Sequence, residues 1–182
     1  ADATIAGAGN KNTAKLGYNG KHSTTEETKT YVWKLNVHKY ALDSTNHEVA
    51  LSGAKFVLYR MDGDTREYAK LTNNKIDGWV TDKGEATTLE TDGAGDILIE
   101  GLNVGTYYLE ETEAPAGYNK LTEPIEVKIT ATPDVTGVSE TVEYKNQNDS
   151  TYTPATNAIV KVLNEAGTQL PSTGGIGTTL FY

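Results

Sequence analysis

Three polar side chains occupy positions where strand-like alternation predicts a buried apolar residue. Each one ends a face whose earlier members are apolar: Lys39 follows Trp33, Leu35 and Val37; Glu111 follows Tyr107 and Leu109; and Asn164 follows Val160 and Val162. An isolated lysine, carboxyl group or carboxamide is costly to bury, because each loses its hydrogen bonds to water. We therefore expect the three side chains to meet one another in the folded protein.

Together, the three side chains define a specific reaction. Desolvation lowers the pKa of a buried lysine and makes its neutral amine available as a nucleophile. Burial also favours a protonated carboxyl group, which can hydrogen-bond to an amide carbonyl and polarise it. Attack of Lys39 on the carboxamide of Asn164, with Glu111 moving protons, would release ammonia and leave an isopeptide bond. From alternation alone, strand-end residues whose polar tips reach solvent are the simpler interpretation.

The elements that must position these residues are short strands separated by turns rich in Gly, Asn and Asp. Many short alternating segments with regular turn signals predict an all-β protein built as an antiparallel β-sandwich. Polar connections are expected at 130–137 and 145–156, and no amphipathic helix is expected. The segments expected to form strands are 13–18, 31–40, 54–59, 68–71, 79–80, 87–89, 96–99, 106–111, 125–129, 139–144 and 158–163.

The composition narrows the partners and the chemistry. The chain has 182 residues, a formal net charge of −9 and no cysteine. The negative charge argues against nucleic acid and anionic membrane surfaces as partners, and the missing cysteines exclude disulfides, zinc–thiolate sites and cysteine nucleophiles. We expect no metal and no cofactor, because the histidines show no ligand spacing and the acidic turns at 62–64 and 92–96 lack the spacing of a calcium loop.

A second motif lies near the C-terminal end of the sequence, at Leu170, Pro171, Ser172, Thr173 and Gly174. Pro171 fixes its own φ and biases the residue before it toward extended geometry, and Gly174 adds no steric bulk. Such a stretch is a poor strand and a poor helix, but it suits being gripped in extended form by another protein. A flexible tail of turn residues is the alternative interpretation.

Residues 107–118 carry a motif that resembles the E-box of Gram-positive sortase-assembled pilins and of collagen-adhesin B-type (Cna B-type) domains. Segments 37–39 and 51–56 resemble the opening of such a domain, and Asn164 followed by 170–175 resembles its last strand and a sortase (LPxTG) sorting motif. The match covers about residues 30 to 175, and its motifs fall in the family's order. The members of the E-box are Tyr107, Leu109, Glu111, Thr112, Ala114, Pro115, Gly117 and Tyr118.

The resemblance implies an immunoglobulin-like antiparallel β-sandwich that contains an intramolecular isopeptide bond. Carried over by position, the bond joins Lys39 to Asn164 and Glu111 catalyses its formation, which agrees with the independent analysis of the strand faces. The resemblance also implies that sortase cleaves after Thr173 and joins the chain covalently to another pilin subunit or to cell-wall peptidoglycan. The protein is then expected outside the cell, at the cell surface, as part of a pilus (fimbria).

The resemblance divides the sequence into three parts. Residues 30–167 would form the Cna B-type domain, and 168–182 would hold the sorting motif and a truncated tail, as in a C-terminal piece of a larger precursor. Residues 1–29 are similar to the closing strand of a preceding pilin domain, which makes Asn12 a candidate for a second isopeptide site; a polar tail is the simpler alternative. The Tyr-Pro-Lys motif of backbone pilins does not occur in this sequence, which leaves backbone, basal and accessory subunits open.

Three classes of function remain. The first is a structural pilus subunit or domain, with sortase and other pilin subunits as partners. The second is a wall-anchored adhesin that binds a host matrix protein or a glycan. The third is an enzyme that carries a surface anchor; we expect no enzyme, because Glu111 would act once, on its own chain.

Overall fold

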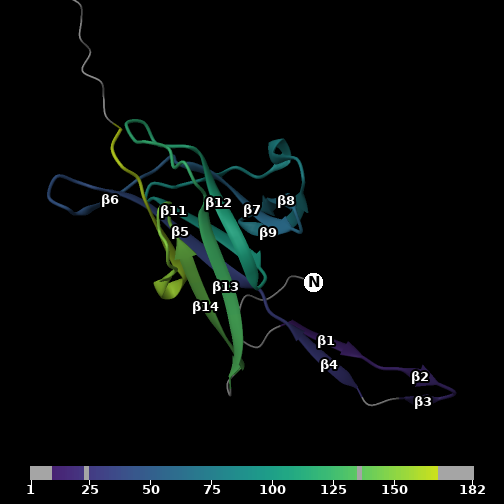
Figure 1. The fold of residues 1–182 in the computed structure, drawn as a ribbon. Coiled ribbons are helices and arrows are strands. Elements are labelled where there is room, and N and C mark those ends of the chain that lie inside the picture. Colours follow the sequence, from purple (N-terminus) through teal and green to yellow (C-terminus); the bar gives the residue numbers. More distant parts are fainter. Residues whose placement is uncertain (1–9, 23–24, 135–136, 168–182) are drawn as a thin grey trace, which may run out of the picture.

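The computed structural model describes residues 10–22, 25–134 and 137–167, and these ranges are almost entirely β-structure (Figure 1). Besides the strands they contain two short 3-10 helices, η1 (Lys83–Glu85) and η2 (Thr156–Ala158). The strands are β1 (Asn10–Ala14), β2 (Gly17–Tyr18), β3 (Lys21–His22), β4 (Glu26–Thr30), β5 (Trp33–Leu42), β6 (Glu48–Ala50), β7 (Lys55–Asp62), β8 (Thr65–Thr72), β9 (Lys75–Val80), β10 (Leu89–Glu90), β11 (Asp96–Leu102), β12 (Gly105–Glu113), β13 (Ile125–Asp134), β14 (Gly137–Lys145), β15 (Thr153–Pro154) and β16 (Ile159–Leu163).

Twelve of the strands form one curled sheet in the order β15-β14-β13-β12-β7-β8-β9-β11-β5-β16, with β10 beside β7 and β6 beside β5. The sheet curls so that β5, β11 and β16 lie against β12, β13 and β14 across a shared core (Figure 1). This arrangement confirms the predicted all-β, immunoglobulin-like sandwich. It also brings the first long strand of the sheet, β5, next to the last one, β16.

Two pairings depart from the expected antiparallel order. β16 runs parallel to β5, and β11 meets β9 in parallel at the single pair Glu100 and Lys75. A parallel pair cannot be closed by a tight hairpin and needs a long crossover connection. For β5 and β16, that connection is almost the whole domain. The expectation of a purely antiparallel sandwich is therefore wrong for the pairing of its first and last strands.

The core follows the alternation of the inward faces. β5 buries every second residue, in agreement with the predicted face, and β12 and β16 do the same. Burial of these faces from both layers supplies the main driving force for the fold. The largest fully buried apolar side chains are Trp33, Phe56, Leu35, Leu58, Ile99, Leu102, Leu109, Ile125, Ile129 and Val37.

The segment expected as a polar connection at 130–137 is instead a hairpin. β13 runs to Asp134, and β14 begins at Gly137, with pairing that continues to the last residues of both strands. Thr side chains are well suited to paired strands, so the polarity of this stretch did not indicate a loop.

The N-terminal part forms a ribbon that extends from the curled sheet (Figure 1). β1 pairs with β4, and β2 pairs with β3, each as a two-stranded antiparallel sheet. The strand expected at 13–18 is therefore divided between β1 and β2. Leu16 and Tyr18, near the tip, are 76% and 79% exposed.

Candidate functional site

Lys39 and Asn164 come from neighbouring strands of one layer, and Glu111 comes from the facing layer. β5 pairs with β16 so that Val162 lies opposite Lys39, and Asn164 follows directly after β16 ends. The backbone N–H of Asn164 donates to the carbonyl of Tyr40 at 2.9 Å, which continues the pairing past the end of β16. Glu111 is on β12. The parallel pairing thus sets Lys39 and Asn164 side by side, and the curl of the sheet brings Glu111 onto them.

The three side chains are in direct contact. Lys39 Nζ donates to Asn164 Oδ1 at 2.6 Å and lies 3.2 Å from Glu111 Oε1. Asn164 Nδ2 donates to the same Glu111 oxygen at 3.2 Å. A single carboxylate oxygen therefore touches both the amine and the amide nitrogen. This is the position from which a carboxyl group can take a proton from one nitrogen and give it to the other.

The triad, as we name Lys39, Glu111 and Asn164, lies inside the protein. The three residues are 0%, 2% and 1% exposed, respectively. This burial contradicts the simpler interpretation, in which strand-end residues extend their polar tips into solvent. Since buried ionisable groups must be paired, the mutual contacts explain how the fold tolerates them.

The environment of Lys39 favours its neutral form. Burial lowers the pKa of the Lys39 ammonium from 10.5 to about 8, and the charge of Glu111 and its hydrogen bond oppose part of that shift. The ring of Phe56 lies 5.5 Å from Nζ and forms part of the apolar surroundings. About a tenth of the amine is therefore neutral at pH 7, far more than for an exposed lysine, and the neutral form is the one that a nucleophile requires.

Backbone groups support the triad at positions that sequence reasoning missed. Lys39 N–H donates to the carbonyl of Gly95, and the carbonyl of Lys39 accepts from Leu51 N–H, both at 2.8 Å. Leu121 N–H donates to Glu111 Oε2 at 2.7 Å. The sequence indicated a turn at Gly95 but not its contact with Lys39. The N–H of Leu121 had no signal at all, because every residue except proline carries one.

The first half of the E-box motif lies on β12. Tyr107 and Leu109 are buried on the same face as Glu111. Thr112 Oγ1 donates to the backbone carbonyl of Lys55 on the neighbouring β7 at 3.1 Å. These contacts hold β12 through its inward face and against β7 along its edge, and so fix the position of the glutamate.

The second half of the motif, from Ala114 to Tyr118, leaves the sheet as a turn. Tyr118 N–H donates to the carbonyl of Pro115 at 3.1 Å, so Tyr118 closes the turn. Gly117 has a φ of 89°, a left-handed value that favours glycine. Tyr118 also forms an antiparallel bridge with Ala166. The turn after the E-box is therefore joined to the segment that follows β16.

Of the other predicted sites, the structure describes only Asn12. The sorting motif at 170–174 lies outside the described residues. Asn12 is an exposed residue of β1, opposite Thr28. In the part of the chain that the structure describes, no three His, Asp or Glu side chains are grouped to hold a metal ion. Within the same residues, no helix has the length and apolar character to cross a membrane.

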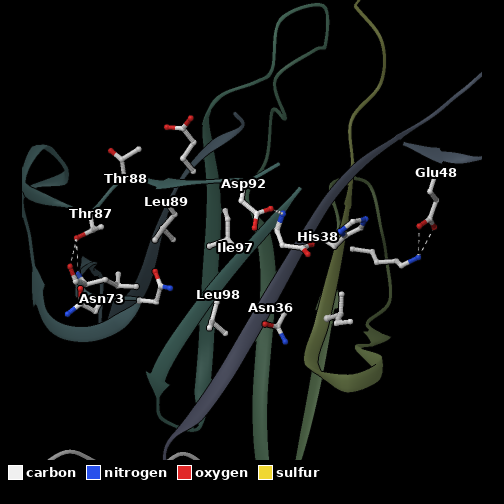
Figure 2. Close-up of a pocket in the computed structure, with 16 residues that line it drawn as sticks. Asn36, His38, Glu48, Asn73, Thr87, Thr88, Leu89, Asp92, Ile97 and Leu98 are labelled. Carbon is white, nitrogen blue, oxygen red and sulfur yellow. Dashed lines mark hydrogen bonds and ion pairs between the residues drawn. The ribbon is translucent and has the colours of Figure 1, made fainter. Parts of the chain in front are cut away.

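An open groove of about 720 Å³ lies on the outer face of the sheet (Figure 2). It is bounded by outward side chains of β5, β11 and β16 and by the turns that follow β8 and precede β10. His38 Nδ1 lies 2.6 Å from Asp96 Oδ1, and Lys161 Nζ lies 2.7 Å from Glu48 Oε1. These four side chains are paired with one another, so their contacts assign the groove no ligand, and the triad is the stronger candidate site.

Comparison with known proteins gives consistent matches. Residues 33–148 match the family described as SpaA, a prealbumin-like fold domain. The structure of the pilus 2b backbone protein of group B streptococcus is 28% identical over 90% of this chain and 52% of its own, with a TM-score of 0.53. The SpaE basal pilin of Lactobacillus rhamnosus GG is 20% identical over 76% of this chain and 48% of its own, with a TM-score of 0.57. The chain thus spans about half the length of these pilins. Comparison with curated proteins gave no match.

Proposed function

The chain belongs to the SpaA family of prealbumin-like fold domains, and on that basis we propose that it is a structural subunit of a Gram-positive pilus, or a part of one, which acts at the cell surface. The similarity to a streptococcal backbone pilin over most of this chain supports the proposal. In this function the domain carries tension between neighbouring subunits. Its chemistry is then directed at its own chain rather than at an external substrate.

The observation that carries the proposal is the contact of Lys39, Glu111 and Asn164 within the core. The neutral amine of Lys39 attacks Cγ of Asn164, and Glu111 accepts a proton from the attacking nitrogen. Glu111 then delivers a proton to Nδ2, the bond from Cγ to Nδ2 breaks, and ammonia leaves. An amide between Nζ and Cγ remains, and Glu111 returns to its starting state. The water-excluded surroundings strengthen each of these electrostatic interactions.

The second covalent step belongs to the sorting motif. A sortase thiolate attacks the carbonyl of Thr173 and releases the part of the chain that begins at Gly174. The acyl group passes to an amine of the next pilin subunit or of cell-wall peptidoglycan. The types of residue in the motif support this role, because Pro171 and Gly174 favour an accessible, extended segment.

Residues 30–167 form one domain in this account, and 1–29 belong to a preceding domain. The N-terminal ribbon supports that division, because an isolated two-stranded ribbon is marginally stable in water. The exposed Leu16 and Tyr18 near its tip are suited to burial against further strands. On this proposal, Asn12 would be the candidate isopeptide acceptor of the preceding domain.

Sortase transfer tests the pilus function directly. The purified chain is incubated with a pilus-type sortase and an amine acceptor, and the product is mapped by peptide mass spectrometry. The expected product carries the acceptor on the carbonyl of Thr173, and Thr173→Ala is expected to give none. Transfer mapped to another residue, or no transfer while a control sorting peptide is cleaved, would contradict the proposal.

A further inference from the structure

The backbone of segment 117–121 forms hydrogen bonds to two parts of the site: the chain just after Asn164, and the side chain of Glu111 on β12. Asn119 N–H donates to the carbonyl of Glu165, the neighbour of the acceptor asparagine, at 2.9 Å. Two residues further on, Leu121 N–H donates to Oε2 of Glu111 at 2.7 Å. One short segment therefore holds the strand end that carries Asn164 and the carboxylate of Glu111 at the same time.

Both ends of the segment are held in place by contacts with the rest of the domain. Gly167 N–H donates to the carbonyl of Gly117 at 2.8 Å, beside the bridge between Tyr118 and Ala166. At its far end the side chain of Leu121 is 6% exposed and belongs to the main core. Because both ends are anchored, the N–H of Leu121 is presented to Glu111 in a fixed direction.

The bond from Leu121 decides which oxygen of Glu111 meets the reactants. The last torsion of a glutamate side chain is broad and roughly two-fold, so an unrestrained carboxylate samples many orientations. With Oε2 held by Leu121 N–H, Oε1 is the oxygen that faces Lys39 Nζ and Asn164 Nδ2, each at 3.2 Å. A proton carrier needs this alignment, and a small misplacement of a catalytic group can cost a large factor in rate.

We propose that the segment 117–121 is the positioning element of the cross-linking reaction, and that the backbone N–H of Leu121 orients the carboxylate of Glu111 toward both reacting nitrogens. The proposal rests on the isopeptide bond of the proposed function. It assigns a role to the residues that follow the E-box glutamate in the chain, beyond the closure of a turn.

The test removes this one N–H and leaves every side chain in place. Leucic acid, the hydroxy-acid analogue of leucine, replaces Leu121, so that an ester oxygen stands where the N–H was. The full chain is refolded from denaturant in its uncross-linked form, and loss of ammonia is followed by mass spectrometry. We expect the ester to slow the reaction roughly tenfold or more. Cross-linking at the rate of the unmodified chain would overturn the proposal.

Gln147→Ala is the matched control for a loosened loop. Gln147 Oε1 accepts from the backbone N–H of Thr122 at 3.0 Å and from its hydroxyl at 3.2 Å, one residue beyond Leu121 and away from Glu111. We expect this variant to cross-link within about twofold of the unmodified rate, because its change does not touch the carboxylate. Equal slowing in the ester and in Gln147→Ala would show that loop rigidity matters rather than the N–H, and would overturn the proposal.

A spectroscopic readout separates orientation from stability. In the uncross-linkable Asn164→Ala chain, which keeps Lys39 beside Glu111, the amide proton of Leu121 is expected at an unusually low field, because it donates to Oε2 of Glu111 over only 2.7 Å. A second substitution, Glu111→Ala, is expected to move that signal upfield and to leave the signal of Asn119 in place. An unchanged Leu121 signal would overturn the proposal. If the unmodified chain never loses ammonia, the proposed function fails; if it does and the ester matches its rate, only this inference fails.

Discussion

Lys39 and Asn164 are 125 positions apart in the chain, and their side chains are joined by a hydrogen bond of 2.6 Å between Nζ and Oδ1. The two residues meet because β5 and β16 pair in parallel, with Val162 opposite Lys39. A bond at this point would close a loop around nearly the whole sandwich. The location of the bond therefore matters for stability as much as its chemistry, because the bond would link β5, the first long strand of the sheet, to β16, the last one.

Glu111→Gln is expected to abolish the cross-link while the chain still folds, because glutamine keeps the shape of the side chain and cannot carry a proton between nitrogens. The uncross-linked variant should lose about 5 kcal/mol of unfolding free energy, on the chain-entropy model for closing a loop of this size. Mass spectrometry and denaturant unfolding measure the two effects. Glu110→Gln is the control, since Glu110 pairs instead with Lys83 on the outer face. Cross-linking of Glu111→Gln at the normal rate would exclude Glu111 as the catalyst.

The rate of cross-linking should depend on pH through Lys39, whose pKa burial lowers to about 8. Below that value most of the amine is protonated and cannot attack, so the rate should fall about tenfold for each pH unit. Above about pH 8 the rate should level off. The measurement is ammonia loss after refolding of uncross-linked chain at a series of pH values, with tryptophan fluorescence as a control for folding. A rate that stays flat from about pH 6 to pH 8 would exclude the neutral amine of Lys39 as the limiting species.

Gly95→Ala should damage the site through the backbone. A Cβ at Gly95 would lie 2.5 Å from the carbonyl oxygen of Lys39, and the residue has a φ of 79°, which L-residues rarely adopt. We expect a loss of about 2 kcal/mol or more of unfolding free energy and slower cross-linking, because the strand that carries Lys39 must shift. Gly93→Ala is a matched control in the same turn, where a Cβ would meet nothing within 4 Å. Similar effects for both variants would contradict a specific role for the close contact at Gly95.

The inward faces of the key strands, and with them the candidate site, could be predicted from sequence. The period of a strand is two, so Trp33, Leu35 and Val37 place Lys39 on the core side without further information. Alternation alone could not decide whether Lys39 was a strand-end residue with a solvated tip. Only the arrangement of the strands in space, with both layers closing over the residue, answers that question.

The rest of the site depended on tertiary geometry. No local pattern distinguishes a parallel partner of β5 from an antiparallel one, because the two partners are separated by almost the whole domain. Leu121 supports Glu111 through its backbone N–H. Every residue except proline has this group, so the sequence could not single out Leu121. The close approach at Gly95 could not be predicted for a different reason. Glycine is common in turns, and the carbonyl of Lys39 that lies against it belongs to a strand distant in the sequence.

Under tension, the cross-link should hold the domain closed. Force that enters through β5 and leaves after β16 passes directly between Lys39 and Asn164, and the parallel pairing loads the hydrogen bonds of these strands in shear. Single-molecule pulling from residues 30 and 168 should extend the unmodified chain only by its short terminal segments. Lys39→Ala should show an unfolding step of roughly 400 Å. Without the cross-link, the 125 positions of chain between Lys39 and Asn164 can be stretched out. Lys161→Ala, which removes an exposed lysine of β16, is the control and should behave like the unmodified chain.

Equal extension of the unmodified chain and of Lys39→Ala would mean that the bond is absent or joins other residues. An unmodified chain that unfolds in one full-length step would have the same meaning. Either result would leave the pilin fold in place and remove its mechanical explanation.

The mass of the intact, denatured chain shows whether the isopeptide bond between Lys39 and Asn164 has formed. Folded protein is unfolded in acid and weighed, and the value is compared with the mass calculated from the sequence. We expect a deficit of one ammonia, together with a branched peptide that joins Lys39 to Asn164 after proteolysis. The full calculated mass in protein that had folded would contradict this expectation.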